Sequence, residues 1–246
     1  MIKFTTFRKK VITLAVTAVL FSGCNANINL GDGIDGNGKV VSQTRNVGNN
    51  FSKIDANRGV NVIIEQADSF FVEVETDENL QSHIITKVEN ETLVITTDEN
   101  IDVATARNVR VKMPNLSGLE SSSGVSVKTI GVFAGNEIDV KTSSGSETNL
   151  TIEFDKIAFQ STSGSTLIAR GKALRLTTRS SSGSTIDARE LLANDVNSES
   201  SSGSSTVVHP IVSLVGKASS GSSINYSGSP KTVSKEEISG GSVSKD

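Results

Sequence analysis

The tripeptide Ser-Ser-Gly, once replaced by Thr-Ser-Gly, returns six times at nearly constant spacing from residue 122 onward. Successive glycines are 21, 19, 19, 20 and 18 residues apart: Gly124, Gly145, Gly164, Gly183, Gly203 and Gly221. A fixed period on this scale is typical of a solenoid. Roughly 19 residues, at about 3.3 Å per residue, form one coil of three short strands and three corners. The repeat therefore predicts an all-β fold, a single-chain β-solenoid (β-helix) with coils of roughly 19 residues.

The six repeated glycines fit the corners of the coils. Glycine adopts φ > 0 without a steric penalty, so one glycine per coil permits a tight corner. Serine and threonine hydroxyls can bond to backbone groups that a corner leaves unpaired. We expect these structural corner glycines to form a column along one edge of the solenoid. An alternative is that the stacked hydroxyls form a recognition stripe.

Apolar residues alternate with polar ones after each corner, which is the pattern of a half-buried strand. Segments between residues 47 and 114 are also rich in Val, Ile, Phe and Thr, and only residues 77–89 are compatible with a short helix. The positions that we expect to face the core in the repeats are Leu150, Ile152, Phe154, Leu174, Leu176, Ile186, Ala188, Ile224 and Tyr226.

The first 23 residues have the pattern of an export signal. A basic start precedes an apolar run that is too short to span a bilayer, which takes about 20 residues. The apolar run ends at Phe21 and is followed by Ser22, Gly23 and Cys24, the only cysteine of the chain, in a segment that resembles the lipobox of bacterial lipoproteins. We therefore predict that Cys24 is lipidated. The expected organisation is a signal peptide (1–23), a flexible tether (24–45), a solenoid domain (46–229; irregular in 46–114, regular in 115–229) and a C-terminal tail (230–246) that protects the last coil.

Composition argues against several kinds of ligand. The net charge is −3, and no basic patch interleaves with aromatic residues, so we expect no nucleic-acid partner. Asp32, Asp35 and Asn37 do not follow the ligand spacing of an EF-hand loop, because Ile34 occupies a ligand position. We therefore predict no metal site.

The sequence also argues against an enzyme. Sugar-cleaving sites pair carboxylates across a cleft, and we expect aromatic platforms beside them, but the chain has no Trp and one Tyr. His83 and His209 have no nucleophile motif nearby, and we expect both to be ordinary surface residues. No hydrolase, zinc-protease or phosphate-loop motif is present. We predict no catalytic residue and no cofactor.

One segment resembles a known family. Gly59-Val60-Asn61 stands where the autotransporter adhesin head GIN-domain family of Bacteroidetes envelope proteins has Gly-Ile-Asn, and Val60 departs from that pattern. The segment VEVETDENLQSHIITKVENETLVI, residues 72–95, is similar to the same family, and the resemblance extends over about residues 40–230. It implies an all-β solenoid attached to the envelope, with an adhesive or structural role and no activity.

Two functions remain open at this point. One is an adhesin-like module that binds a glycan or a protein surface, and the other is a structural component that self-associates into a homo-oligomer. In both, a lipid at Cys24 would anchor the protein to the outer membrane. The residues after Cys24 carry no acidic cluster, which favours the periplasmic face over the cell surface.

Overall fold

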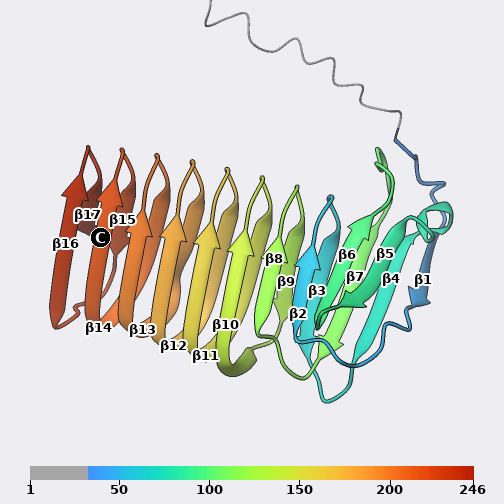
Figure 1. Cartoon of the computed structure of the whole chain (residues 1–246), viewed down its shortest axis with the longest axis horizontal. Helices are drawn as coiled ribbons and strands as arrows, with labels where there is room; N and C mark the ends of the chain where they lie inside the picture. Colours follow the sequence, from blue (N-terminus) through green and yellow to red (C-terminus); the bar gives the residue numbers. More distant parts are fainter. Residues whose placement is uncertain (1–32) are drawn as a thin grey trace, which may run out of the picture. The chain divides into compact units, whose positions relative to one another are not determined.

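The computed structural model describes residues 33–246, whose regular secondary structure is almost entirely β-strand (Figure 1). The predicted signal peptide, Cys24 and residues 24–32 of the predicted tether lie outside the described residues. Within residues 33–246, no helix is both long and apolar enough to cross a bilayer. The elements before the repeats are β1 (Val40–Thr44), β2 (Lys53–Ala56), β3 (Asn61–Gln66), β4 (Phe71–Asp77), the 3-10 helix η1 (Glu78–Leu80), β5 (Ile84–Glu89), β6 (Thr92–Thr97) and β7 (Arg107–Met113).

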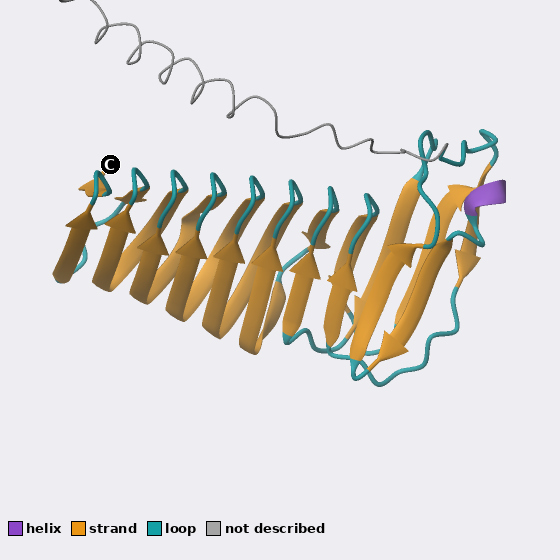
Figure 2. Ribbon diagram, turned by 45° about the horizontal axis from the view of Figure 1, so that its top comes forward, coloured by secondary structure: helices purple, strands orange, loops and turns teal. Residues whose placement is uncertain are grey.

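The repeats form stacked coils, as the period predicts. Their strands are β8 (Gly118–Ser121), β9 (Ser126–Ile130), β10 (Phe133–Thr142), β11 (Glu147–Ser161), β12 (Thr166–Ser180), β13 (Thr185–Ser200), β14 (Ser205–Ser219), β15 (Ser223–Tyr226), β16 (Thr232–Ile238) and β17 (Ser242–Lys245). Neighbouring coils pair in parallel, with residue i opposite residue i+19 between β11 and β12. Each long strand runs down from one corner, bends and rises to the next corner (Figure 2).

The coil shape differs from the expected three corners. One tight corner per coil is present, and the opposite side of β11 to β14 is a smooth bend within a strand of 15 or 16 residues. The alternation between core and solvent is interrupted at the bend, where two successive residues, such as Asp155 and Lys156, both face the solvent. The expected corners at the bend are therefore absent.

The core is a set of columns that run through successive coils. In one of them Ile157 pairs with Leu176, Leu176 with Val196 and Val196 with Leu214, and each is at most 3% exposed. Stacking like residues in register buries each side chain between two others. Of the residues expected to face the core, only Leu174 does not, with 53% of its surface exposed. Its neighbour Ala173 is buried instead, because the alternation changes phase at the bend.

The N-terminal region joins the same stack. β2 pairs in parallel with β8, and β3 with β9, so they form a coil in register with the repeats. β6 pairs in parallel with β2, and β7 with β3, so they extend the two sides of the stack. The strand direction then changes: β5 pairs antiparallel with β6, β4 with β7, and β1 with β4. The tether was expected to reach residue 45, but Val40–Thr44 form β1. The helix expected in residues 77–89 is reduced to η1, and β5 follows it.

The C-terminal region contains one coil more than expected. Residues 230–246 were predicted to be a tail, with a disordered end, but β16 pairs with β14 and β17 pairs with β15. Val243 is 3% exposed and continues the core. The solenoid therefore continues beyond residue 229, where the sequence analysis placed its end. The sequence signal was present, since Ser239-Gly240 lies 19 residues after Ser220-Gly221.

Candidate binding surface

The corners form one continuous column. The six repeated glycines have φ between 68° and 73°, and the serine before each has φ between 51° and 59°. Positive φ at two consecutive residues is the requirement of a type I′ turn, and the N–H of Ser146 closes such a turn onto the carbonyl of Ser143 at 3.1 Å. Each corner also bonds to the next, as when the Gly145 N–H donates to the Ser163 carbonyl at 3.2 Å.

The family-like tripeptide lies at the start of this column. Gly59 has φ 69°, and its N–H donates to the Ser123 carbonyl at 3.0 Å, as the repeated glycines do to their neighbours. Val60 is fully buried, and Asn61 reaches Asn108 at 3.3 Å. The motif is thus the first corner, and the column comprises the glycines at 59, 124, 145, 164, 183, 203, 221 and 240.

The serine after each corner glycine serves the fold. Ser165, Ser184 and Ser222 are at most 2% exposed. Their hydroxyls donate to backbone carbonyls of the preceding coil at 2.7–2.8 Å. A buried hydroxyl with such a partner is satisfied and holds two coils together. Of the serines that flank the corner glycines, only the one directly before each glycine, such as Ser163, is exposed. The predicted recognition stripe therefore has one exposed flanking hydroxyl per coil.

A row of charged and amide side chains runs beside the column on the outer face. We call it the charge row; its members each lie four residues before a corner glycine: Asp55, Glu120, Lys141, Gln160, Arg179, Glu199, Lys217 and Glu236. Strand register places them side by side, for example Arg179 opposite Glu199 and Glu199 opposite Lys217. The sequence contained this signal in the same period as the glycines, although the prediction did not include it.

Ion pairs link neighbours of the charge row. Lys141 contacts Glu120 at 2.7 Å, and this hydrogen bond raises the pKa of Lys141. Arg179 contacts Glu199 at 3.3 Å. Lys217 contacts Glu236 at 3.0 Å, and this bond raises the pKa of Lys217. All of these side chains are well exposed, and exposed ion pairs contribute little to stability, so a polar ligand can replace the partners at low cost.

A groove of about 500 Å³ lies between the charge row and the corners. Its lining combines guanidinium, ammonium, carboxylate, amide and hydroxyl groups with an apolar share from Ala218, Ile238 and side-chain methylenes: Gln160, Arg179, Ser180, Ser181, Glu199, Ser200, Ser201, Lys217, Ala218, Ser219, Glu236 and Ile238. Such groups can donate hydrogen bonds to, and accept them from, a polar ligand. The groove follows successive coils, so it offers the same kinds of groups repeatedly along its length.

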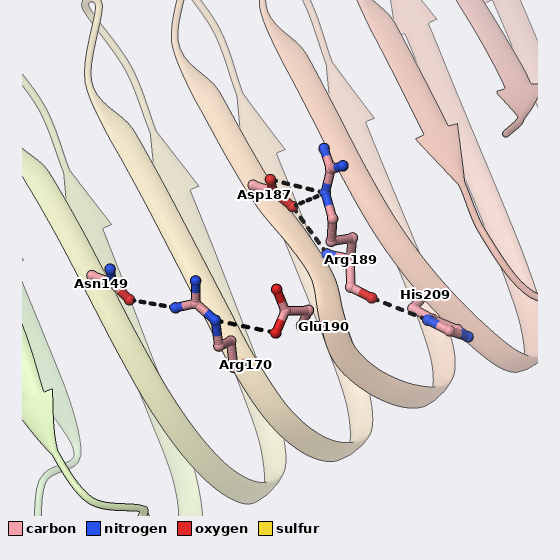
Figure 3. A network of polar contacts seen from close by, with 6 residues as sticks. All are labelled: Asn149, Arg170, Asp187, Arg189, Glu190 and His209. Atoms are coloured by element: carbon pink, nitrogen blue, oxygen red, sulfur yellow. Dashed lines mark hydrogen bonds and ion pairs between the residues drawn. The ribbon is translucent and has the colours of Figure 1, made fainter.

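A second polar network lies on the other half of the coils (Figure 3). Arg170 joins Asn149 at 2.8 Å to Glu190 at 3.2 Å. Arg189 contacts Asp187 at 2.9 Å, and this bond raises the pKa of Arg189. These side chains already bond to one another across coils β11, β12 and β13, and they support the sheet.

The two histidines have ordinary partners. His83 Nδ1 lies 2.9 Å from the Asp98 carboxylate, and His209 Nδ1 donates to the Arg189 carbonyl at 3.0 Å. Neither lies beside a nucleophile among these contacts. Residues 33–246 contain no cluster of His, Cys, Asp or Glu suited to a metal ion. The predicted lipidation site, Cys24, lies outside the described residues.

Comparisons with known proteins agree with this architecture. The family model "Putative auto-transporter adhesin, head GIN domain" matches residues 50–230. No curated protein matches the chain. A "putative adhesin" of Bacteroides fragilis has a similar structure, with TM-score 0.80 and 20% identity over 87% of this chain and all of that one.

Two further solved structures have the same fold. A "putative lipid binding protein" of Parabacteroides distasonis gives TM-score 0.71 and 19% identity, covering 87% of this chain and 99% of that one. A "putative adhesin" of Parabacteroides merdae gives TM-score 0.69 and 19% identity, covering 87% and 98%. At such identities the likeness shows the fold alone.

Proposed function

Since the chain belongs to the auto-transporter adhesin head GIN-domain family, we propose that it is a non-catalytic, adhesin-like protein of the cell envelope that binds a glycan. The binding site in this proposal is the groove between the charge row and the corner column. A single observation carries the proposal: side chains with both donors and acceptors repeat from coil to coil along an exposed groove. A chain of sugar rings offers hydroxyl groups at a comparable repeat, and each can replace one partner of an exposed ion pair.

The proposed anchor is a lipid on Cys24. Cleavage before Cys24 would leave a mature chain with an acylated first residue and nine further steps to Gly33, where the described residues begin. Stable anchoring takes two signals, such as two acyl chains. We propose the outer membrane as the location, on the support of the lipobox-like sequence and of the family.

Glycan arrays and isothermal titration of a selected glycan test the proposed site. The variant Arg179→Gln with Lys217→Gln removes two cations of the charge row, and we expect a loss of affinity of at least about tenfold, since each cation lost removes a charge-assisted hydrogen bond. The matched control, Lys156→Gln with Arg175→Gln, removes two cations from the same face nearer the bend, and we expect it to bind like the parent. Equal affinities of the two variants would contradict the proposed site.

The alternative function, a structural component that self-associates, makes a different prediction. It requires oligomers of the intact chain, which light scattering can detect. Binding to no glycan or matrix protein, together with stable oligomers, would favour that alternative.

A further inference from the structure

The cations of the charge row have a period of their own. From β10 to β14 the row consists of Lys141, Gln160, Arg179, Glu199 and Lys217, one residue from each strand. Successive strand pairings align these residues with one another, and the five strands follow one another along the solenoid in Figure 1. A cation is therefore present in every second coil, and an amide or a carboxylate lies between two cations.

The carboxylates of the charge row do not share this regularity. Asp55 and Glu120 lie opposite each other in neighbouring coils, and Gln160 occupies a coil where strict alternation of charge would require a carboxylate. The regular element of the row is thus the cation, which favours a ligand that carries anionic groups at a regular interval. The carboxylate of Glu199 repels an anion in the intervening coil, and such a repulsive contact contributes to specificity.

Each cation keeps hydrogen-bond donors for a ligand. Among the described residues Arg179 hydrogen-bonds Glu199 through Nε alone, at 3.3 Å, and 61% of its side chain is exposed. Its terminal nitrogens can therefore form two hydrogen bonds with one carboxylate, the geometry that a guanidinium group favours. Lys141 and Lys217 each direct one of three ammonium donors to a carboxylate of the row, at 2.7 and 3.0 Å.

The distance between neighbouring cations suits a disaccharide. Adjacent strands are about 4.8 Å apart, so cations in every second coil are about 10 Å apart. Two sugar rings of an extended glycan cover nearly the same length. A glycan with one carboxylate per disaccharide can thus place successive carboxylates against Lys141, Arg179 and Lys217. The ring in between meets Gln160 or Glu199, which accept hydrogen bonds from its hydroxyl or amide groups.

We propose that the ligand is an acidic glycan in which a uronic acid alternates with a neutral sugar, so that one carboxylate is bound for every two coils. This inference rests on the proposed function, because it uses the same charge row and the groove beside it. A glycan with a carboxylate on every ring would place one of them against Glu199. A neutral glycan would leave the three cations without a charged ligand group.

Isothermal titration of the mature protein with three octasaccharides tests the inference. Hyaluronan alternates glucuronate with N-acetylglucosamine, its carboxyl-reduced form is uncharged, and oligogalacturonate has a carboxylate on every ring. We expect hyaluronan to bind at least about tenfold more tightly than its reduced form, which cannot form charge-assisted hydrogen bonds with the cations. Over oligogalacturonate we expect a preference of at least about threefold, because Glu199 repels the additional carboxylate.

Two variants separate the order of the charges from the net charge. Glu199→Lys places cations in three successive coils, so we expect the preference for hyaluronan over oligogalacturonate to disappear or to reverse. The matched control, Asp195→Lys, makes the same change of charge in β13, but nearer the bend and outside the lining of the groove. We expect this control to keep the preference of the parent.

Each contrary result has a separate meaning. Equal affinities for hyaluronan and its carboxyl-reduced form would overturn the inference and leave the proposed glycan binding intact, as would arrays on which only neutral glycans bind. Loss of the preference in both lysine variants would overturn the inferred register, because net charge alone would then explain it. Binding to no glycan of any kind would overturn the proposed function and this inference together.

Discussion

The N-terminal end of the solenoid finishes with strands that oppose the direction of the coils, whereas the C-terminal end finishes with a complete coil. At the N-terminal end, β5 pairs antiparallel with β6, and β4 with β7, and Leu80 of η1 is fully buried. These elements cover the first coil with backbone and with apolar side chains. A solenoid needs such caps because its terminal strands otherwise present unpaired edges.

The C-terminal end is closed by two side chains. Lys235 Nζ donates to the Val243 carbonyl at 2.7 Å, and the Val243 N–H donates to Glu237 Oε1 at 2.6 Å. Lys235 also lies 5.4 Å from the centre of the Tyr226 ring. Both charged residues belong to β16 and form hydrogen bonds with backbone groups of β17. Among the described residues, β17 pairs with β15. The N-terminal edge is thus covered by antiparallel strands, and the C-terminal edge by hydrogen bonds from two charged side chains.

We expect the N-terminal cap to depend on one buried carboxylate. Asp77 is fully buried and accepts hydrogen bonds from the N–H groups of Gly38 at 2.6 Å and Thr105 at 2.7 Å. We expect Asp77→Ala to lower the melting temperature more than any other single change considered below, because it leaves buried donors unpaired. Thermal unfolding followed by circular dichroism measures this effect. A melting temperature within the error of the parent would contradict it.

Acid should weaken the same cap. Burial raises the pKa of Asp77, but hydrogen bonds from Thr105 and Gly38 outweigh burial and hold the pKa below the ordinary value of 3.8. A lowered folded-state pKa stabilises the fold above pH 3.8, and the contribution is lost as the pH falls through the folded-state pKa. The parent should therefore lose more stability than Asp77→Asn as the pH falls from about 5 to about 2. Parallel losses would exclude this role.

Within the coils, a glycine at the bend should matter more than one at a corner. Gly171 has φ 123°, and a Cβ atom there would lie 1.9 Å from the Ile152 carbonyl oxygen. Gly171→Ala combines a backbone clash with strain, so we expect a loss of about 3 kcal/mol or more in the free energy of unfolding. Urea denaturation provides the measurement. A loss below that of a corner variant would contradict the close packing at this bend.

A corner glycine should give an intermediate effect. Gly164 has φ 69° and no atom within 4 Å of an added Cβ, so only the backbone conformation opposes substitution. We expect Gly164→Val to lose about 1–3 kcal/mol, and the exposed control Arg175→Gln to change stability by less than about 0.5 kcal/mol. Identical unfolding midpoints for these two variants would show that the corner does not need glycine.

The sequence predicted the coils well and the ends poorly, and the reason is physical. A repeated corner constrains every coil in the same way, so the period of Gly124 to Gly221 was sufficient for the fold, the coil length and the column. The cap depends on contacts between distant segments, such as Asp77 with Gly38, which no local pattern encodes. The last coil was missed because Lys235 and Glu237 are charged residues at positions that the pattern assigns to the core.

The binding surface was predicted only in part. The repeat predicts a stripe of hydroxyl groups, but buried ones such as those of Ser165, Ser184 and Ser222 bond to the backbone within the fold. The charge row shares the period of the glycines and could have been found by aligning the repeats on Gly145 or Gly164. The exposure of Leu174 could not have been found in this way, because Leu174 has the spacing of a core residue and only the bend turns it outward.

The size of the protein in solution, measured by sedimentation equilibrium, tests the difference between the two ends most directly. The variant Lys235→Met with Glu237→Gln frees the edge of β17, and the control Lys217→Met with Glu236→Gln removes an exposed ion pair that joins β16 of the last coil to β14 of the preceding coil. The expected result is concentration-dependent association of the first variant, with parent and control remaining monomeric. A first variant that stays monomeric at the same concentrations would contradict closure of the C-terminal end by these side chains.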